Sequence, residues 1–202
     1  MPVNAPAEVR LRYKYRVAAT RSSQILIEAT LQLIAESGVD SLTISQVAAR
    51  AGVSRATAYR EFGDKDKLLS AVAAREVQQM VAETMAGIDP AGDPVRNVPA
   101  VVLAALAYLR RHAAFRYVRE HEPHWLLQAV LTIAPQSMNL VQVVAVTVAP
   151  IIASSQAKLW LPAAEAAEIV VRTVLSHALV EQSYLTDEQV AESVLRAIRD
   201  AD

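Results

Sequence analysis

The sequence predicts an all-α protein of about nine helices, and three observations support this. Glycine is scarce, with 5 residues in a chain of 202, and the rest of the composition favours helices over a turn-rich β fold. Apolar residues recur every three or four positions, which is the period of a helix with one buried face. Helix-capping residues and prolines separate these stretches, and no strand-length alternation bounded by turns occurs.

Composition limits the classes of protein that fit. Apolar residues make up 53% and charged residues 20%, so a sizeable core can form. There is no cysteine, which excludes disulfides and cysteine zinc sites and fits a reducing compartment, so we expect a cytoplasmic protein. The longest apolar run, residues 143–153, is shorter than the ~20 residues that span a bilayer, and we expect no membrane partner.

Charge is distributed unevenly along the chain. The net charge is −1, yet residues 1–21 hold five basic side chains against one acidic, a local charge of +4. The basic residues are Arg10, Arg12, Lys14, Arg16 and Arg21. We predict a flexible basic arm over residues 1–21 that meets nucleic acid phosphate, although a solvated basic tail would give the same pattern.

The remaining chain reads as two helical domains, residues 22–68 and 69–202. In the first, a helix begins at Ser22 and ends at Gly38, and three short helical signals follow between residues 42 and 68. A longer helix should run from Lys65 to about Ala86. Further helices are expected over residues 95–112, 114–120, 125–133, 136–149, 162–183 and 187–200, with Pro123, Pro135 and Pro150 between them.

Residues 43–62 form a helix-turn-helix pattern. Thr43 can cap the first helix, with Gln46 reaching back to it. Gly52 stands where a left-handed residue is needed to end that helix. The first helix has a buried stripe at spacings of three and four, which consists of Ile44, Val47, Ala48 and Ala51.

The second helix of the pattern should project polar groups from its exposed surface. Ser54 caps it, and it runs from Arg55 to about Phe62, with Ala58 and Phe62 facing inward. Arginine can bind guanine edges and threonine can bind a base or touch a thymine methyl. The exposed donors are Arg55, Thr57, Tyr59 and Arg60. The pattern therefore predicts a DNA-reading element.

Residues 22–69 resemble the DNA-binding domain of the TetR family of regulators. The matching residues are Ile25, Ala29, Gly38, Thr43, Val47, Ala48, Ala51, Gly52, Val53, Ser54, Tyr59, Phe62, Lys65, Leu68 and Leu69. The resemblance implies a homodimer on a palindromic, double-stranded operator. It also implies a C-terminal domain for ligand binding and dimerisation, in which an effector releases the DNA.

The resemblance also implies roles for single residues. Thr43 would hold phosphate, Ser54 would cap the recognition helix and could touch phosphate, and Lys65 would pin the DNA backbone. Arg55, Thr57, Tyr59 and Arg60 would lie on the recognition helix. Two positions depart from the family: Ala58 replaces a larger aliphatic residue, and Glu61 replaces a neutral or basic one. Glu61 could point away, pair with Arg60 or Arg21, or read a cytosine amine.

The C-terminal half gives weaker signals. An apolar or amphipathic effector is the default expectation, and its candidate contacts are Tyr108, Phe115, Trp125, Gln128, Met138 and Gln142. The alternative for each of them is an ordinary core or surface residue. Candidate dimer contacts are Ile169, Val170, Thr173, Val174, His177 and Ala178. A helix buried within its own subunit would look the same.

We expect no metal site and no cofactor. His121 and His124 have a metal-ligand spacing, but Pro123 breaks the helix that would align them. His177 reads as a packed histidine, with a dimer seam or pocket wall as the alternative. No catalytic triad, phosphate loop or acid pair appears, so we do not expect an enzyme. The rival interpretation is a helical small-molecule-binding protein with a vestigial DNA head.

Overall fold

The computed structural model describes residues 20–89, 92–131, 139–154, 158–180 and 182–199, and these residues form ten α-helices. The all-α prediction is confirmed, with one helix more than expected. Within the described residues the extended structure is limited to an isolated antiparallel bridge between Leu159 and Arg199. The chain divides into two compact units, residues 1–76 and 77–202. The boundary lies inside one helix, α5 (Lys65–Met85).

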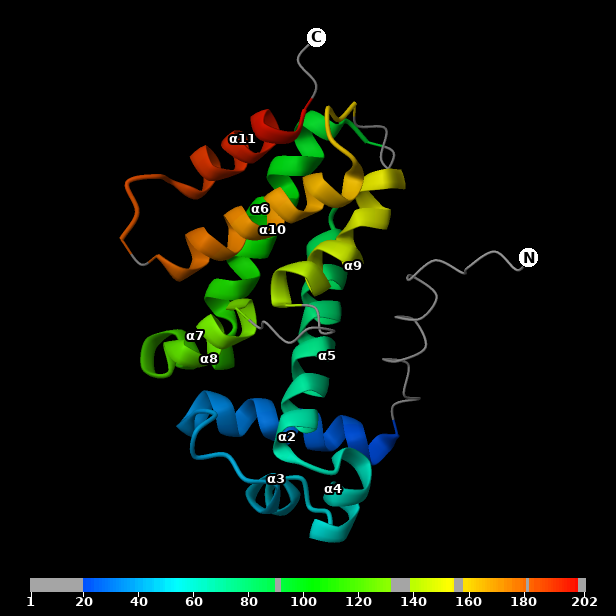
Figure 1. Ribbon diagram of the computed structural model, residues 1–202, viewed down its shortest axis with the longest axis vertical. Helices are drawn as coiled ribbons and strands as arrows, with labels where there is room; N and C mark the ends of the chain where they lie inside the picture. The colour runs from blue at the N-terminus through cyan, green and yellow to red at the C-terminus, as the bar shows by residue number, and fades with distance from the viewer. Residues whose placement is uncertain (1–19, 90–91, 132–138, 155–157, 181, 200–202) are drawn as a thin grey trace, which may run out of the picture. The chain divides into compact units, whose positions relative to one another are not determined.

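The first unit is built around α2 (Arg21–Ser37), which packs against both α3 (Ile44–Arg50) and α4 (Arg55–Phe62) (Figure 1). Thr20 caps the N-terminus of α2, and Gly38 ends the helix with a φ of 82°. Apolar side chains from all four helices form the core, and the most fully buried are Leu26, Val47, Ala48, Ala58 and Leu68. Their burial fixes α4 against α2.

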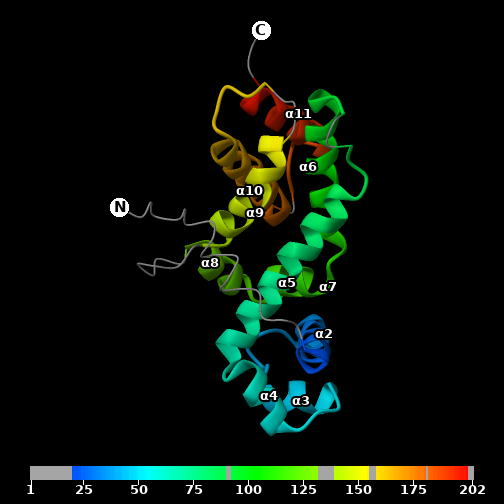
Figure 2. The same cartoon turned by 90° about the vertical axis from the view of Figure 1, so that its right-hand side faces the viewer.

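The second unit contains α6 (Pro94–Arg111), α7 (Ala113–His121), α8 (Pro123–Leu131), α9 (Leu140–Ser154), α10 (Ala163–Leu179) and α11 (Asp187–Ile198). Helices α6, α10 and α11 pack on one another, and α9 lies along α10 (Figures 1 and 2). Their shared core includes Val102, Leu106, Ala166, Val194 and Ile198. Thr186 and Gln189 form the predicted capping box at the start of α11.

Two prolines lie inside helices rather than between them. Pro150 was expected to end a helix at residue 149, but α9 continues to Ser154, and Pro99 lies inside α6. A proline removes one backbone hydrogen bond. Here the packing of α9 along α10 offsets that loss, which local sequence signals cannot reveal. Two expected helices, at residues 125–133 and 136–149, can be compared with the structure only in part. Residues 132–138, the end of the first and the start of the second, lie outside the described part of the chain.

Among the described residues, no single helix is long and apolar enough to cross a membrane. One bent pair, α6 with α7, meets the length and composition criteria only when its two helices are taken together across a 71° bend.

Candidate nucleic-acid interface

The first helix of the predicted helix-turn-helix begins with the expected capping box. The Thr43 hydroxyl accepts the Gln46 amide proton over 3.2 Å, and the Gln46 side chain accepts the Thr43 amide proton over 2.9 Å. The hydroxyl of Thr43 also donates to Gln46 Oε1 over 2.7 Å. Thr43 is exposed, but a phosphate would have to compete with Gln46 for that proton.

The turn between α3 and α4 depends on Gly52. Its φ is +67°, in the left-handed region that favours glycine. After it, the Val53 amide donates back to the Ala48 carbonyl over 3.0 Å, which closes the end of α3. The turn therefore has the predicted form.

The recognition helix α4 is capped by Ser54, whose hydroxyl accepts the Thr57 amide proton over 3.0 Å. The Ser54 and Thr57 hydroxyls also lie 2.9 Å apart within hydrogen-bonding distance. Ala58 is buried, so the smaller side chain at this position still packs inward. The cap and the buried alanine leave the opposite surface of α4 exposed.

Cations of the first unit fall into two groups. Arg50, Lys67 and Arg75 each pair with a carboxylate, as in the bidentate Arg50–Glu36 contact at 2.7 and 2.8 Å. This pair lowers the pKa of Glu36 through hydrogen bonds from Arg50. Among the described residues of this unit, no carboxylate partner is seen for Arg21, Arg55, Arg60 or Lys65, and Lys65 instead binds backbone carbonyl oxygens.

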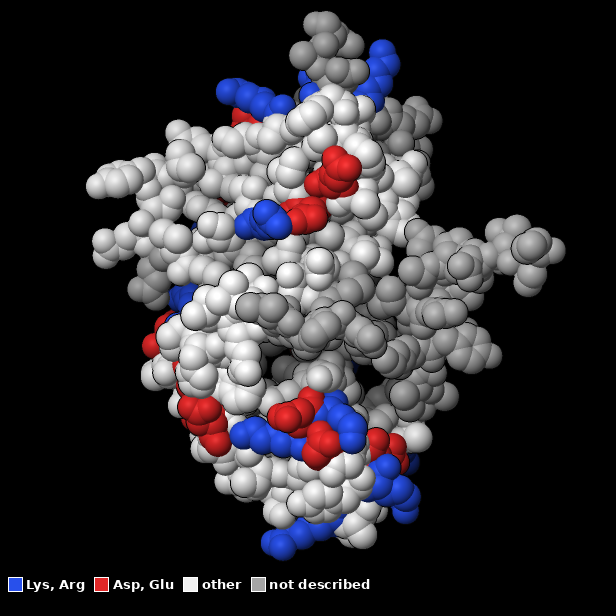
Figure 3. All heavy atoms as spheres, in the orientation of Figure 1, with Lys and Arg blue, Asp and Glu red and all other residues white. Residues whose placement is uncertain are grey.

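Arg55 and Arg60 lie on α4 with Tyr59, whose side chain is 52% exposed. In Figure 3, basic side chains project at the lower end of the face in view, over α3 and α4, and acidic and basic groups are interspersed above them. The exposed surface of α4 can therefore offer two guanidinium groups and a phenol hydroxyl to a partner.

Lys65 makes contacts that the sequence did not predict. Its ammonium group donates to the carbonyl oxygens of Val39 and Asp40, at 2.6 and 3.3 Å. Two of its three protons therefore stabilise the turn after α2. A phosphate contact, as the sequence resemblance implied, would have to use the third.

Glu61 makes a contact that was not among the three alternatives considered from sequence. Its carboxylate accepts a hydrogen bond from the Thr20 hydroxyl, with 3.0 Å between the two oxygen atoms. Thr20 and Glu61 are 41 positions apart, so only the folded unit brings them together.

The candidate effector contacts are not alike in burial. Tyr108 is buried beneath Arg111, and Phe115 and Trp125 are half-buried. Gln128 and Gln142 are exposed, and the Gln142 side chain accepts the Asn139 amide proton at the start of α9. Met138 lies outside the described residues. All six residues stay predictions, and they differ only in that the two glutamines face solvent while Tyr108, Phe115 and Trp125 are at least half-buried.

The candidate dimer contacts differ in how far they are buried within their own chain. Four of the six, Val170, Val174, His177 and Ala178, are buried within their own chain. The three apolar ones belong to the core shared by α6, α10 and α11. As placed here they have little surface to offer a second subunit. Ile169 and Thr173 are half-buried and keep some surface free.

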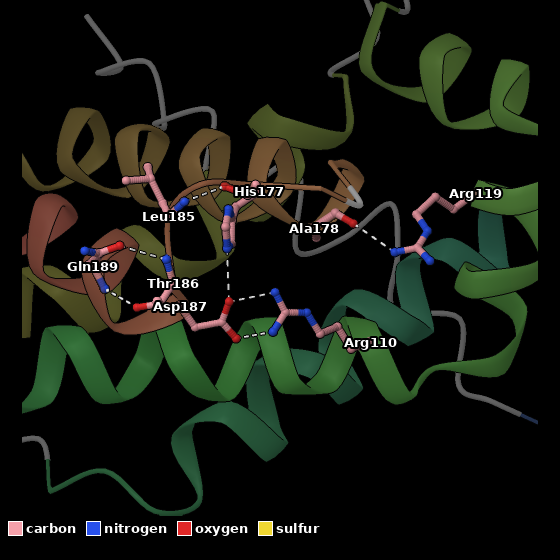
Figure 4. Close-up of polar contacts among 9 residues, drawn as sticks. Arg110, Arg119, His177, Ala178, Leu185, Thr186, Asp187 and Gln189 are labelled. Carbon is pink, nitrogen blue, oxygen red and sulfur yellow. Dashed lines mark hydrogen bonds and ion pairs between the residues drawn. The ribbon is translucent and has the colours of Figure 1, made fainter.

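His177 matches the packed interpretation. Its Nε2 donates to Asp187 Oδ1 over 3.0 Å, and the same carboxylate binds Arg110 (Figure 4). His121 Nδ1 instead lies 3.1 Å from the Tyr117 carbonyl oxygen, and the His124 ring lies against Trp125. Among the described residues, no group of three or more acidic or histidine side chains is placed to hold a metal ion.

Comparison with known proteins identifies the first unit. A sequence profile described as "Bacterial regulatory proteins, tetR family" matches residues 26–72. This segment is a TetR-family DNA-binding domain. It covers α3, α4 and the parts of α2 and α5 that pack around them.

Sequence relatives within the family match the same end of the chain more broadly. The chain is 30% identical over 101 residues to the HTH-type transcriptional regulator BetI of Brucella canis, a match that covers 50% of this chain and 48% of that protein. It is 32% identical over 77 residues to BetI of Rhizobium meliloti, covering 38% of each. The matches span about half the length of these curated relatives or less.

Solved structures show the same fold over most of the chain. The TetR family repressor AlkX from Dietzia sp. superposes with a TM-score of 0.67 at 21% identity, covering 87% of this chain and 91% of that one. The repressor QsdR of R. erythropolis gives a TM-score of 0.63 at 19% identity, covering 90% and 97%. At these identities the likeness establishes the fold of the chain.

Proposed function

We propose that this chain is a TetR-family transcriptional repressor that binds a palindromic operator as a homodimer and is released by a small effector. The observation that carries the proposal is the exposed surface of α4, where Arg55 and Arg60 have no carboxylate partner among the described residues, while Arg50, Lys67 and Arg75 do. Unpaired guanidinium groups on a recognition helix are suited to guanine edges and phosphates. The family assignment agrees with the expectation that the chain is not an enzyme.

The exposed side chains of α4 are assigned different contacts on the DNA. Arg55 and Arg60 read base edges, and the Tyr59 hydroxyl meets a phosphate. Two such helices in a dimer must lie about one DNA turn apart, roughly 34–36 Å, to enter successive major grooves. Helix α5 continues from the first unit into the second, so an effector that favours another tilt of α5 would change that spacing. An apolar or amphipathic effector near Tyr108 suits the buried surroundings of that residue.

Selection of bound DNA from a random pool by the purified protein tests the proposal first, and a palindromic sequence is expected. Replacing Arg55 or Arg60 by alanine should then weaken binding to that sequence by about 1–3 kcal/mol each, because each removes a base-edge contact. Arg196→Ala is the matched control: this exposed arginine in α11 pairs with Glu192, and its loss should leave DNA binding unchanged. The rival function, a small-molecule-binding protein with a vestigial DNA head, predicts no enriched sequence.

A further inference from the structure

We infer that Lys65 is a positioning residue for DNA binding: its ammonium group joins the two ends of the helix-turn-helix and so holds α3 and α4 in place for the DNA. The inference rests on the proposed function. It differs from the role that the sequence resemblance implied, in which Lys65 contacts the DNA backbone itself.

Lys65 lies at one end of the helix-turn-helix, and its two acceptors lie at the other. The chain enters this segment after Asp40, passes through α3 and α4, and leaves it at Lys65, the first residue of α5. The ammonium nitrogen lies 2.6 Å from the Val39 carbonyl oxygen and 3.3 Å from the Asp40 carbonyl oxygen. These two hydrogen bonds therefore close the intervening residues, 41–64, into a loop.

Both ends of this loop are anchored in the core of the first unit. Val39 and Leu42 are 5% and 3% exposed, and Leu68, one turn into α5, is 2% exposed. The Val39 carbonyl oxygen accepts the Leu42 amide proton over 3.1 Å as well as a proton from Lys65. Because a packed interior yields little, a link between two anchored segments fixes the start of α3 relative to the end of α4.

Electrostatics favour this position of the charge. The C-terminus of a helix carries a partial negative charge that a cation stabilises, whereas a cation at a helix N-terminus is unfavourable. The last turn of α2 contains no basic residue, and Val39 and Asp40 directly follow its C-cap, Gly38. Lys65 begins α5, so its ammonium group is more stable at the end of α2 than at the start of its own helix. The charge is thus satisfied within the first unit.

The link itself is tested without DNA. Lys65→Met keeps an apolar side chain of similar length but removes the three donor protons. The Leu42 amide, which shares the Val39 carbonyl oxygen with Lys65, should exchange with solvent about tenfold faster in this variant. Lys67→Met is the matched control: this lysine pairs with Asp64 instead, and its loss should leave that exchange unchanged. If exchange is also unchanged in Lys65→Met, the link does not hold the turn and the inference is overturned.

Affinity for the selected DNA is then measured over a range of salt concentrations, at a temperature at which every variant is folded. Lys65→Met should bind at least about fivefold more weakly, because hydrogen bonds from a charged donor are lost. Its salt dependence should equal that of the unsubstituted protein, whereas loss of a phosphate contact would lower the slope of log K against log salt by about 0.9. A shallower slope would assign Lys65 to phosphate, and an unchanged affinity would leave it a purely structural role, so either result overturns the inference.

Lys65→Arg separates the two roles even if Lys65→Met does not fold. A guanidinium group binds phosphate at least as well as an ammonium group does, because its planar donors match two phosphate oxygens at once. It fits less well between two carbonyl oxygens that surround a compact ammonium group. Lys65→Arg should therefore bind the DNA more weakly than the unsubstituted protein, and equal or tighter binding overturns the inference. If the unsubstituted protein selects no DNA, the proposed function fails and the inference with it, whereas failure of the inference alone is seen only in the variants.

Discussion

Asp187 is the residue through which three helices of the second unit are joined. Its carboxylate, in the first turn of α11, accepts hydrogen bonds from both terminal nitrogens of Arg110 on α6, with Nη2 at 2.6 Å from Oδ1, and from His177 on α10 (Figure 4). The hydrogen bonds from Arg110 are the main cause that lowers the pKa of Asp187 below its ordinary value of 3.8. The bond from His177 lowers it further, and partial burial opposes both.

A lowered carboxylate pKa in the folded state means that the ionised form favours folding. The ionised carboxylate contributes to the free energy of unfolding at any pH above the pKa that the group has in the unfolded chain. This contribution is lost as the pH falls toward the lower pKa that the group has in the folded protein. We therefore expect Asp187→Asn to lower the free energy of unfolding at pH 7 by about 1–3 kcal/mol, because it removes hydrogen bonds between charged groups. The loss should shrink on acidification below about pH 4.

Urea denaturation at pH 7 and pH 3 measures this effect. Glu192→Gln provides the control, since it breaks an exposed ion pair with Arg196 on the same helix and should cost under about 0.5 kcal/mol. An equal loss for Asp187→Asn at both pH values would contradict the assignment.

The turn between α3 and α4 is the element on which the recognition helix depends. Gly52 has a φ of +67°, and a side-chain carbon added there would meet no atom within 4 Å. Backbone conformation, rather than space, is what requires glycine at this position.

Gly52→Ala should therefore destabilise the protein by about 1–2 kcal/mol through backbone strain alone. Thermal or urea unfolding measures the change. Gly87→Ala is the matched control, because Gly87 also has open space around it but no positive φ, so its substitution should change stability by no more than about 0.5 kcal/mol. If the two substitutions lower the free energy of unfolding equally, backbone strain does not explain why residue 52 is a glycine.

At the scale of the whole molecule, several exposed apolar side chains lie in the connections before and after α10. Trp160 precedes this helix and is 60% exposed, and Tyr184 and Leu185 follow it at 107% and 52%. Leu127 on α8 is similarly exposed at 59%. Of these, Tyr184 and Leu185 are neighbours in one connection, and adjacent exposed apolar side chains are a common mark of a protein–protein interface.

We expect the chain of 21.9 kDa to sediment as a dimer of twice that mass, with Tyr184 and Leu185 buried between subunits. Replacing both by serine should weaken the dimer at least about tenfold, because apolar area is lost from the interface. Leu127→Ser should leave the dimer intact. If Leu127→Ser weakens the dimer and the double serine variant does not, the interface lies at α8 instead. If the unsubstituted chain sediments as a monomer at high concentration, the expected dimer is wrong.

The features predictable from sequence alone are those whose partners lie within a few residues. Thr43 with Gln46, Ser54 with Thr57, and Gly52 at the end of α3 are local caps and turns, and local chemistry is sufficient to fix them. The family pattern in residues 26–72 consists largely of such signals together with the buried stripe of α3. The recognition helix and its exposed arginines were therefore readable from the sequence.

Tertiary structure decided the contacts between residues distant in the chain. Lys65 binds a carbonyl 26 positions away, Glu61 a hydroxyl 41 positions away, and Asp187 a guanidinium 77 positions away. Packing also decided that Pro150 lies within a helix and that Val170 and Val174 face their own core. Periodicity shows that a helix has an apolar face but not which helix covers it, because many partners bury such a face equally well.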